Sequence, residues 1–363
     1  MRVLVVTVVH TPLDARIHHR QIRSMVAEGW QVTYAAPFGA TKTPHDQVIG
    51  GVTTVDLPRA VGRRRLRAAR AARRTVRRLP EHDVLVLHDP ELVLAVLGLR
   101  GRCATVLDVH EDLVGSLVDR PWIPRRLRPL VGACARALER WTERNLHVLL
   151  AERRYAERFE HPHPVVRNLP WAAETDGDVP SRDVVVYVGR LSIARGLLEL
   201  LELGARLRAT TDLRVELVGA PDTEVADLLE AAASRGDVRW HGFLPSEQAL
   251  RVVDGALAGL CLLHDQPNYR VSLPTKVVEY LSRGVPVVTT PLPEAVELVE
   301  GHDAGIVVPF GDVAATEAAV LALHRDPARR AAMAARGRRA VGDGWTWEGE
   351  APRFLAALRA AAR

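Results

Sequence analysis

The feature that most constrains the fold of this chain is a regular alternation of short, apolar, β-branched runs with longer segments of helical period. Continuous apolar strands separated by helices indicate parallel sheets that are covered on both faces. The runs that we expect to be strands lie at 3–8, 32–36, 84–87, 104–108, 147–150, 184–188, 214–218, 257–263, 285–289 and 305–308. The predicted fold class is therefore α/β.

The alternation is interrupted once, near the middle of the chain. Residues 169–183, in NLPWAAETDGDVPSRD, combine prolines, a glycine and acids without a period, as linkers do. A chain of 363 residues is also too long for one compact core. We therefore expect two doubly wound, Rossmann-like domains, residues 1–168 and 184–345, facing each other across a cleft. The helix at 346–363 would either cross back to the first domain or cap the second.

Composition limits the class of protein and its compartment. Hydrophobic residues make up 47% of the chain, which favours a folded globular protein. The longest uncharged apolar run, residues 92–99, is far shorter than the roughly 20 residues of a membrane span. The first residues predict a buried strand and show no signal-peptide cleavage site. Cys103, Cys134 and Cys261 lack metal-binding spacing, so we expect free thiols in a reducing cytosol.

The motif GRLSIARG, residues 189–196, has groups that suit a diphosphate. It places Arg190 and Arg195 on a turn between an apolar strand and a helix. An arginine fork makes paired, charge-assisted hydrogen bonds to phosphate. Gly189 would let the backbone approach the ligand, and the following helix would add its N-terminal dipole. Alternatively, both arginines lie on solvated faces, as many arginines of this chain do.

The motif SLPTKVVEYLSRGVPVV, residues 272–288, predicts a helix that ends at Gly284 before another buried strand. On this helix Glu279 could accept hydrogen bonds from both hydroxyls of a ribose. Lys276 lies three residues earlier on the same face, and would either reach the phosphates or pair with Glu279. The only other lysine is Lys42, so a lysine kept here in an arginine-rich chain carries weight. Together the two motifs predict a nucleotide-sugar site.

The second half resembles the donor domain of the family-4 retaining glycosyltransferases, which have the glycosyltransferase B fold. The stretches that carry the resemblance are YVGRLSIARGLLELLEL, LRVELVGAPD, VRWHGFLPSEQAL, SLPTKVVEYLSRGVPVVTT and EAVELVE. The first half is more loosely similar, through VVHTPLDARIHHRQIRSMVAEGWQVTYAAP, LHDPEL and DVHEDL. The resemblance implies an enzyme that moves a sugar from a nucleoside diphosphate to a hydroxyl group with retention of the anomeric configuration.

The resemblance also implies roles for individual residues. Arg190 and Arg195 match the basic pair that holds the donor diphosphate, and Glu279 matches the second glutamate of the family's E-x7-E motif, the ribose ligand. The other residues that we expect on the donor side are Gly189, Gly219 and Lys276.

His110, in DVHEDL, matches the histidine beside the donor sugar and the reaction centre, although an ordinary histidine at a strand end is the alternative. His110, Arg190 and Arg195 form the expected catalytic set, because the two cations would stabilise the departing diphosphate. The residues expected on the acceptor side are Asp14, Arg16, His88, Asp89 and Glu111.

Two departures from the family's pattern concern the donor sugar. Val271 stands where the first glutamate of E-x7-E would fall, so that carboxylate is missing or supplied elsewhere, for example by Asp265. The loop HTPLDAR after the first strand also lacks the glycine pair of many relatives.

We expect no metal ion and no other cofactor. The only D-x-D, at Asp176 and Asp178, lies in the linker, and two arginines already neutralise the diphosphate. His18-His19 and the pair His161 and His163 have no partners at recognised zinc spacing.

Two arginine-rich segments lie in the first half, Arg59–Arg78 and Pro121–Trp141. In the first, Leu66, Ala69, Val76 and Leu79 would form a thin apolar stripe, so the segment could lie on an anionic membrane surface. A solvated charged face is the alternative. We expect no nucleic-acid partner, because no helix-turn-helix, aromatic platform or zinc module accompanies the charge.

The sequence thus predicts a cytoplasmic transferase, either free or peripheral at the inner face of the membrane, that uses a nucleoside-diphosphate sugar, with UDP favoured. The acceptor would be a lipid-linked envelope glycan intermediate or a small natural-product scaffold such as an aminocyclitol. Two other readings stay open. One is a catalytically degenerate binding or scaffold protein, which Val271 favours, and the other is a nucleotide-sugar epimerase on the same fold.

Overall fold

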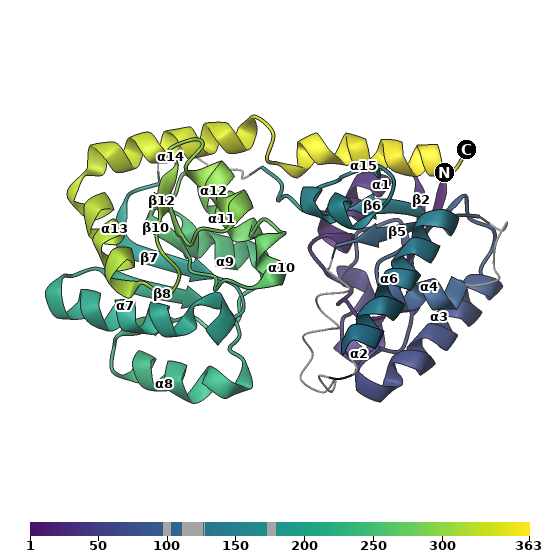
Figure 1. The fold of residues 1–363 in the computed structure, drawn as a ribbon, viewed down its shortest axis with the longest axis horizontal. Helices are drawn as coiled ribbons and strands as arrows, with labels where there is room; N and C mark the ends of the chain where they lie inside the picture. Colours follow the sequence, from purple (N-terminus) through teal and green to yellow (C-terminus); the bar gives the residue numbers. More distant parts are fainter. Residues whose placement is uncertain (97–102, 111–125, 127, 173–178) are drawn as a thin grey trace. The chain divides into compact units, whose positions relative to one another are not determined.

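The computed structural model describes residues 1–96, 103–110, 126, 128–172 and 179–363. The chain divides into two compact units (Figure 1). The first comprises Met1–Asn168 together with Trp347–Arg363, and the second comprises Leu169–Thr346. Each unit contains one sheet, and every strand pair in both sheets is parallel.

The sheet of the first unit has the order β3-β2-β1-β4-β5-β6. Its strands are β1 (Arg2–Val6), β2 (Gln31–Ala36), β3 (Val52–Asp56), β4 (Val84–Leu87), β5 (Ala104–Val109) and β6 (His147–Leu150). Its helices are η1 (Ile17–Ile22), α1 (Arg23–Ala27), α2 (Phe38–Thr41), η2 (His45–Gln47), η3 (Gly62–Arg64), α3 (Arg65–Arg78), α4 (Pro90–Val96), α6 (Arg128–Asn145), η5 (Arg153–Arg158) and α15 (Trp347–Ala361).

The sheet of the second unit, β12-β11-β10-β7-β8-β9, repeats this order. Its strands are β7 (Arg182–Val188), β8 (Arg214–Val218), β9 (Val238–Trp240), β10 (Ala256–Cys261), β11 (Val287–Thr289) and β12 (Gly305–Val307). Its helices are η6 (Ile193–Arg195), α7 (Leu197–Thr210), η7 (Thr223–Val225), α8 (Ala226–Ser234), α9 (Ser246–Val253), α10 (Pro267–Arg270), α11 (Thr275–Ser282), α12 (Pro293–Val299), α13 (Val313–Arg325) and α14 (Pro327–Gly342).

The strand order reverses between β1 and β4 in the first unit and between β7 and β10 in the second. Ligands of open α/β sheets bind beyond the carboxyl ends of the strands at such a reversal. The predicted fold class is confirmed: the chain is α/β, with two doubly wound, Rossmann-like units. The fold therefore directs the search for a site to the loops after these four strands.

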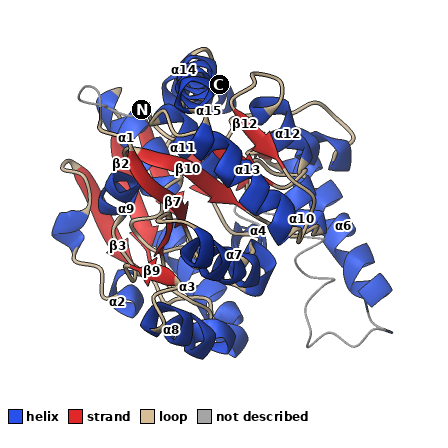
Figure 2. Ribbon diagram, turned by 90° about the vertical axis from the view of Figure 1, so that its left-hand side faces the viewer, coloured by secondary structure: helices blue, strands red, loops and turns tan. Residues whose placement is uncertain are grey.

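Helices cover both faces of each sheet (Figure 2). In the second unit, Val185 and Tyr187 of β7 pack with the apolar sides of α7, α8 and α13. The alternate residues Val184 and Val186 pack with α11 and α12. Each fully buried aliphatic side chain contributes about 1.5–3 kcal/mol. A strand buried on both faces explains why β7 has no polar alternation in the sequence.

The last helix, α15, belongs to the first unit, where it packs against η1, α1 and β5 (Figure 1). Trp347 at its start is fully buried and donates its indole N–H to Ser24 Oγ over 2.8 Å. Glu350 accepts a hydrogen bond from Arg167 Nε at 2.9 Å. The residues from Trp347 onward therefore complete the first core.

The structure differs from the sequence expectation at three places. Strands β3 and β9, which the pattern did not indicate, both lie at sheet edges. β11 begins at Val287, not at Val285, because Pro286 intervenes and has no N–H for the ladder. The expected linker is shorter, since Leu169 is buried in the second core and β7 already begins at Arg182. Residues 173–178 lie outside the described residues.

The arginine-rich segment Arg59–Arg78 forms α3 and the turns before it. The apolar stripe expected on its outer side mostly faces inward, because Ala69, Val76 and Leu79 pack on the first core and only Leu66 is largely exposed. In the second segment, residues 121–125 and 127 lie outside the described residues. No helix in the described part of the chain is long and apolar enough to span a membrane.

Candidate functional site

The loops after β7 and β8 come together through two glycines. Gly189 and Gly219 have φ of +136° and +144°, which favour glycine. A Cβ on Gly219 would lie 1.9 Å from the Gly189 carbonyl oxygen. The two strand ends therefore approach each other backbone to backbone, and a side chain at position 219 would not fit between them.

Lys276, on the first turn of α11, lies beside Gly189. Its side chain is buried, with 6% of the residue exposed, and Nζ lies 3.8 Å from the centre of the Tyr187 ring. A Cβ on Gly189 would lie 3.3 Å from Nζ. Nζ has no hydrogen-bond partner among the residues that the structure describes, so Lys276 does not pair with Glu279 there. An ammonium that is buried without a counter-charge indicates an anion site.

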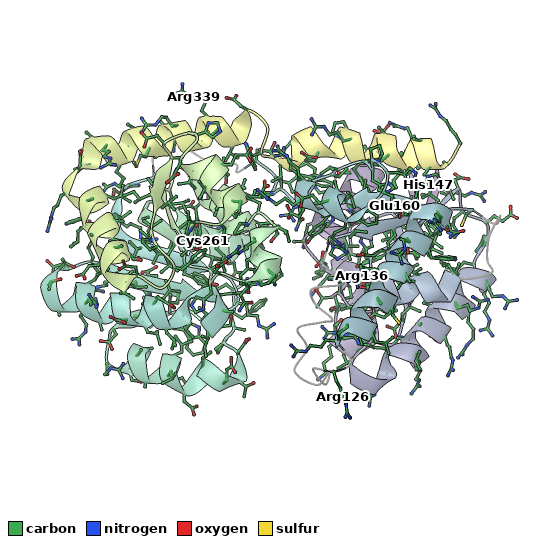
Figure 3. The ribbon with its side chains drawn as sticks, viewed as in Figure 1. Arg126, Arg136, His147, Glu160, Cys261 and Arg339 are labelled. Atoms are coloured by element: carbon green, nitrogen blue, oxygen red, sulfur yellow. The ribbon has the colours of Figure 1, made fainter. Side chains whose placement is uncertain are left out.

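Arg195 lies on the same side of the sheet. It ends η6, directly before Gly196, which opens α7. Burial raises the pKa of the Cys261 thiol at the end of β10 (Figure 3), and the positive charges of Lys276 and Arg195 oppose that rise. Both cations therefore act on the carboxyl end of β10, at the reversal of the strand order. Leu262 O, 2.3 Å from a Cβ on Gly196, keeps this turn tight.

Arg190 is placed differently. Its side chain is 66% exposed and forms an ion pair with Asp222, in the loop after β8. Its carbonyl oxygen accepts a hydrogen bond from Tyr187 Oη over 2.7 Å. The backbone of Arg190 thus belongs to the turn above Gly189, while its guanidinium points to Asp222. Its role toward a diphosphate stays a prediction.

The ribose and sugar side of this site is less complete. Glu279 is half-buried on α11, one turn after Lys276. Val271 is half-buried at the end of α10. Asp265, considered as a substitute carboxylate, is exposed and bound by Arg270, whose Nη2 lies 2.5 Å from Asp265 Oδ2. The arginine would have to be displaced before Asp265 could accept from a sugar.

The first unit gathers its polar residues around one buried carboxylate, Asp108 of β5. Arg16 donates to both its oxygens, over 2.7 and 2.6 Å, and Gln21 donates to Oδ2 over 2.7 Å. His88 Nδ1 lies 3.2 Å from the same oxygen. Burial alone would raise the pKa of Asp108, but the charge and hydrogen bonds of Arg16 hold it well below its usual value. Arg16, expected on the acceptor side, thus holds both oxygens of Asp108, and its role toward an acceptor stays a prediction.

Two further carboxylates shape the loop after β1. Asp89 Oδ2 accepts from Thr7 Oγ1 at 3.0 Å and from Val8 N at 2.5 Å. Asp14 Oδ1 accepts from the amides of Arg16 and Ile17, at 2.8 and 3.0 Å. Asp14 and Asp89 each turn their second oxygen toward the ring of His10, at 3.5 and 3.4 Å. His10 is not among the residues predicted from the sequence, although its spacing of four from Asp14 is a signal that the sequence carries.

His110 follows β5 and lies beside His10. Its Nδ1 is 3.0 Å from the Asp108 carbonyl oxygen, and its Nε2 is 2.9 Å from His10 Nε2. Burial lowers the pKa of His110 to about 3. Its ring is therefore neutral over the whole physiological range. The structure brings His110, His88, Asp89 and Asp14 together at the carboxyl ends of β1, β4 and β5, while Glu111 lies outside the described residues.

Ligand atoms of His88, Asp108 and His110 lie within 4.8 Å of one another, close enough for one metal ion. The guanidinium of Arg16 occupies both oxygens of Asp108, and its positive charge would oppose a cation. A second group, Glu143, Glu160 and His161, lies at the surface. His161 and His163 both approach Glu143 Oε1, at 3.3 and 3.1 Å. The D-x-D at 176–178 lies outside the described residues.

Comparison with known protein families gives a match within the second unit. Residues 182–326 match the family described as Glycosyl transferases group 1. These residues carry a glycosyltransferase domain. The chain is 29% identical to the D-inositol 3-phosphate glycosyltransferase of Rhodococcus opacus (strain B4) over 197 residues, which are 52% of this chain and 44% of that relative. The chain thus spans less than half of the length of that curated relative.

Solved structures resemble the whole chain. The sucrose-phosphate synthase of Thermosynechococcus elongatus superposes with a TM-score of 0.75 at 16% identity, covering 99% of this chain and 98% of that one. Anabaena HepE in complex with UDP-glucose gives the same TM-score and identity, covering 99% and 100%. Identities this low show the fold alone, and the fold is glycosyltransferase B.

Proposed function

We propose that the protein is a retaining, metal-independent glycosyltransferase that moves a sugar from a nucleoside diphosphate to a hydroxyl acceptor. The observation that carries the proposal is Lys276, a buried ammonium without a hydrogen-bond partner among the described residues, held over Gly189 at the reversal of the second sheet. UDP is the favoured nucleotide, because HepE, which shares the fold, is known in complex with UDP-glucose. The acceptor would be a lipid-linked envelope glycan or a small natural-product scaffold.

A buried charge without a partner lowers the stability of the free protein. Such a cost is kept when the charge serves a ligand, and the ligand must then be an anion that reaches Lys276 Nζ beside the Tyr187 ring. A diphosphate fits this requirement: it can span Lys276 and Arg195 and receive the Arg190 amide and the N-terminal dipole of α7. Glu279 would take the ribose hydroxyls.

The reaction needs little covalent chemistry from the protein. The departing diphosphate gains negative charge in the transition state, and cations fixed before the reaction stabilise that charge. Lys276 and Arg195 would supply this stabilisation without a metal ion. The acceptor hydroxyl would attack from the face that the diphosphate leaves, and the phosphate would take its proton, so that the anomeric configuration is retained. His110 of the first unit would stand by the donor sugar.

The test is release of nucleoside diphosphate from UDP-, GDP-, ADP- and dTDP-sugars, measured in EDTA and again with magnesium. We expect one nucleotide class to be turned over equally well in both. Lys276→Met should lower kcat/KM roughly 10²-fold, the loss expected for one preorganised charge contact to the transition state. Lys42→Met, which changes the only other lysine, exposed in the first unit, is the matched control and should keep full activity.

The other outcomes separate the remaining readings. Activity that disappears in EDTA and returns with magnesium would contradict metal independence. A changed sugar still attached to its nucleotide would indicate an epimerase. If a nucleotide binds but no sugar leaves it, the degenerate scaffold that Val271 favours takes first place.

We also propose that the first unit binds the surface of an anionic membrane through α3. Arg67, Arg70 and Arg74 are exposed and recur at the spacing of one helix face, and Leu66 beside them is 64% exposed. Charge is therefore the main attraction, because the other apolar residues of α3 face the core. A lipid-linked acceptor would be presented at such a surface.

A further inference from the structure

His110 has a histidine partner, His10, that lies a hundred residues earlier in the chain. The two Nε2 atoms are 2.9 Å apart, and the ring centroids are 4.7 Å apart. Two imidazole nitrogens at this distance share one hydrogen, so one of them donates and the other accepts. Which one donates follows from the partners of the two Nδ1 atoms.

His110 can only be the acceptor. Its Nδ1 lies 3.0 Å from the carbonyl oxygen of Asp108, which accepts hydrogen bonds and cannot donate them, so Nδ1 carries the hydrogen. The ring is buried and neutral, as its lowered pKa of about 3 also indicates. A neutral imidazole has one N–H, so Nε2 of His110 offers a lone pair to His10.

His10 therefore carries a hydrogen on Nε2, and its surroundings place a second one on Nδ1. Nδ1 lies 3.5 Å from Asp14 Oδ2, and Nε2 lies 3.4 Å from Asp89 Oδ1. The other oxygen of each carboxylate is already bound by backbone amides, so the oxygens that face His10 are the ones left for it. A ring between two carboxylates, with hydrogens on both nitrogens, is an imidazolium.

We propose that His10 is the charged member of a histidine pair and a positioning residue that fixes the tautomer and orientation of His110. The expected effect on kcat rests on the proposed glycosyltransferase function, whereas the proposed charge of His10 does not depend on it. Both nitrogens of His110 are engaged within the first unit, so its ring is fixed before any substrate arrives. The charge of the pair sits on His10, whose side chain is 17% exposed.

The described ionisable groups around the pair are Asp14 after β1, Asp89 and His88 after β4, Asp108 of β5, and Arg16. When the pH rises and His10 loses a proton, the new lone pair faces either Asp14 or the lone pair of His110. Both contacts are repulsive, so deprotonation weakens the hold on the His10 ring and, through it, on His110. Activity that depends on a fixed His110 should therefore fall on the alkaline side.

The first experiment measures the charge states directly, without substrate. In wild-type protein with 15N-labelled histidine, the resonances of His10 are identified as those that are absent from His10→Gln. Near neutral pH, they should show that both ring nitrogens of His10 are protonated. Those lost in His110→Gln should show the neutral Nδ1–H form. His147→Gln, exposed on the first unit, is the assignment control (Figure 3). A neutral His10, or a His110 protonated on Nε2, would overturn the proposal.

The second experiment uses the pH profile of kcat, which a merely structural role would not reshape. His10→Gln keeps a donor toward His110 but cannot ionise, so it should lose the alkaline decline of the wild type. His10→Phe removes the donor and should lower kcat roughly 10²-fold, as a small misplacement of a reacting group does, with the KM for the donor unchanged. An unaltered alkaline decline in His10→Gln would contradict the proposal. A wild type without transferase activity would refute the proposed function, and the NMR result would still decide on the pair.

Discussion

At the scale of single residues, the described part of the first unit is organised around a buried carboxylate that is paired with an arginine. Asp108 is fully buried and accepts hydrogen bonds from Arg16 and Gln21. Two histidines lie close to the same carboxylate. Removing one partner from such a network leaves an uncompensated charge and costs about 3–5 kcal/mol. The second unit contrasts with this, because Lys276 Nζ has no hydrogen-bond partner among the described residues and lies over the face of the Tyr187 ring. This difference supports the proposal that Lys276 serves an anionic ligand.

The buried histidines predict how stability depends on pH. The pKa of His110 is lowered by burial from 6.5 to about 3, and that of His18 to about 4. Between these values and 6.5 the unfolded chain binds protons that the folded chain does not, so the free energy of unfolding falls as the pH falls. Each histidine contributes about 1.4 kcal/mol per pH unit in its window.

Urea unfolding from about pH 7 to about pH 4 checks this prediction. His110→Gln removes one titrating group and should flatten the dependence by that amount. His147→Gln, at an exposed position, should leave the slope unchanged. An identical slope in wild type and His110→Gln would show that His110 titrates normally in the folded protein.

At the scale of elements, an irregular helix places buried polar groups of the first unit. Residues 17–22 form a π-helix, and the amide of Gln21 donates to the Arg16 carbonyl over 3.0 Å, an i to i+5 bond. This geometry brings Arg16 and Gln21 to the same carboxylate, Asp108. On the opposite side of the unit, α3 buries Ala68 and Ala72 and leaves arginines outside.

The membrane proposal is tested on α3 by flotation with vesicles of defined lipid composition. Wild type should float with anionic vesicles and not with neutral ones, and salt should weaken the binding. Each arginine near an anionic surface is worth about 1 kcal/mol, so the triple change of Arg67, Arg70 and Arg74 to Gln should weaken binding roughly 10²-fold. The control changes three exposed arginines of the second unit, Arg325, Arg329 and Arg339. If both triple variants lose the same amount of vesicle binding, the net charge of the protein drives the binding, and α3 has no special part in it.

The sequence predicted the central strands well, because buried parallel strands are continuous apolar runs. It missed β3 and β9, since VTTVD is only half-buried at a sheet edge and VRW is three residues long. It placed Lys276 in the site but could not tell whether the lysine pairs with Glu279, because that depends on burial against Tyr187. His10 was missed for a related reason: its contacts to residues 89 and 110 are long-range, and periodicity does not report them.

At the scale of the whole molecule, the two units have separate cores and the same strand order. Unfolding therefore need not follow a single two-state transition, and a ligand held by one unit raises the transition of that unit. The residues that we propose hold the donor lie in the second unit, and the histidine pair lies in the first. A nucleotide should thus stabilise the second unit without any contribution from His10 or His110.

The most direct test of the central claim is calorimetric unfolding of wild type and Lys276→Met, in EDTA, with and without UDP. In wild type, UDP at about 100 times its Kd should add about 2.7 kcal/mol and raise the transition of the second unit by roughly 5–10 °C. Lys276→Met should unfold at a higher temperature than wild type in the absence of UDP, because it removes a buried charge that has no hydrogen-bond partner among the described residues. It should also show no shift with UDP. A variant that is less stable than wild type and still responds fully to UDP would contradict the assignment of Lys276 to an anion site.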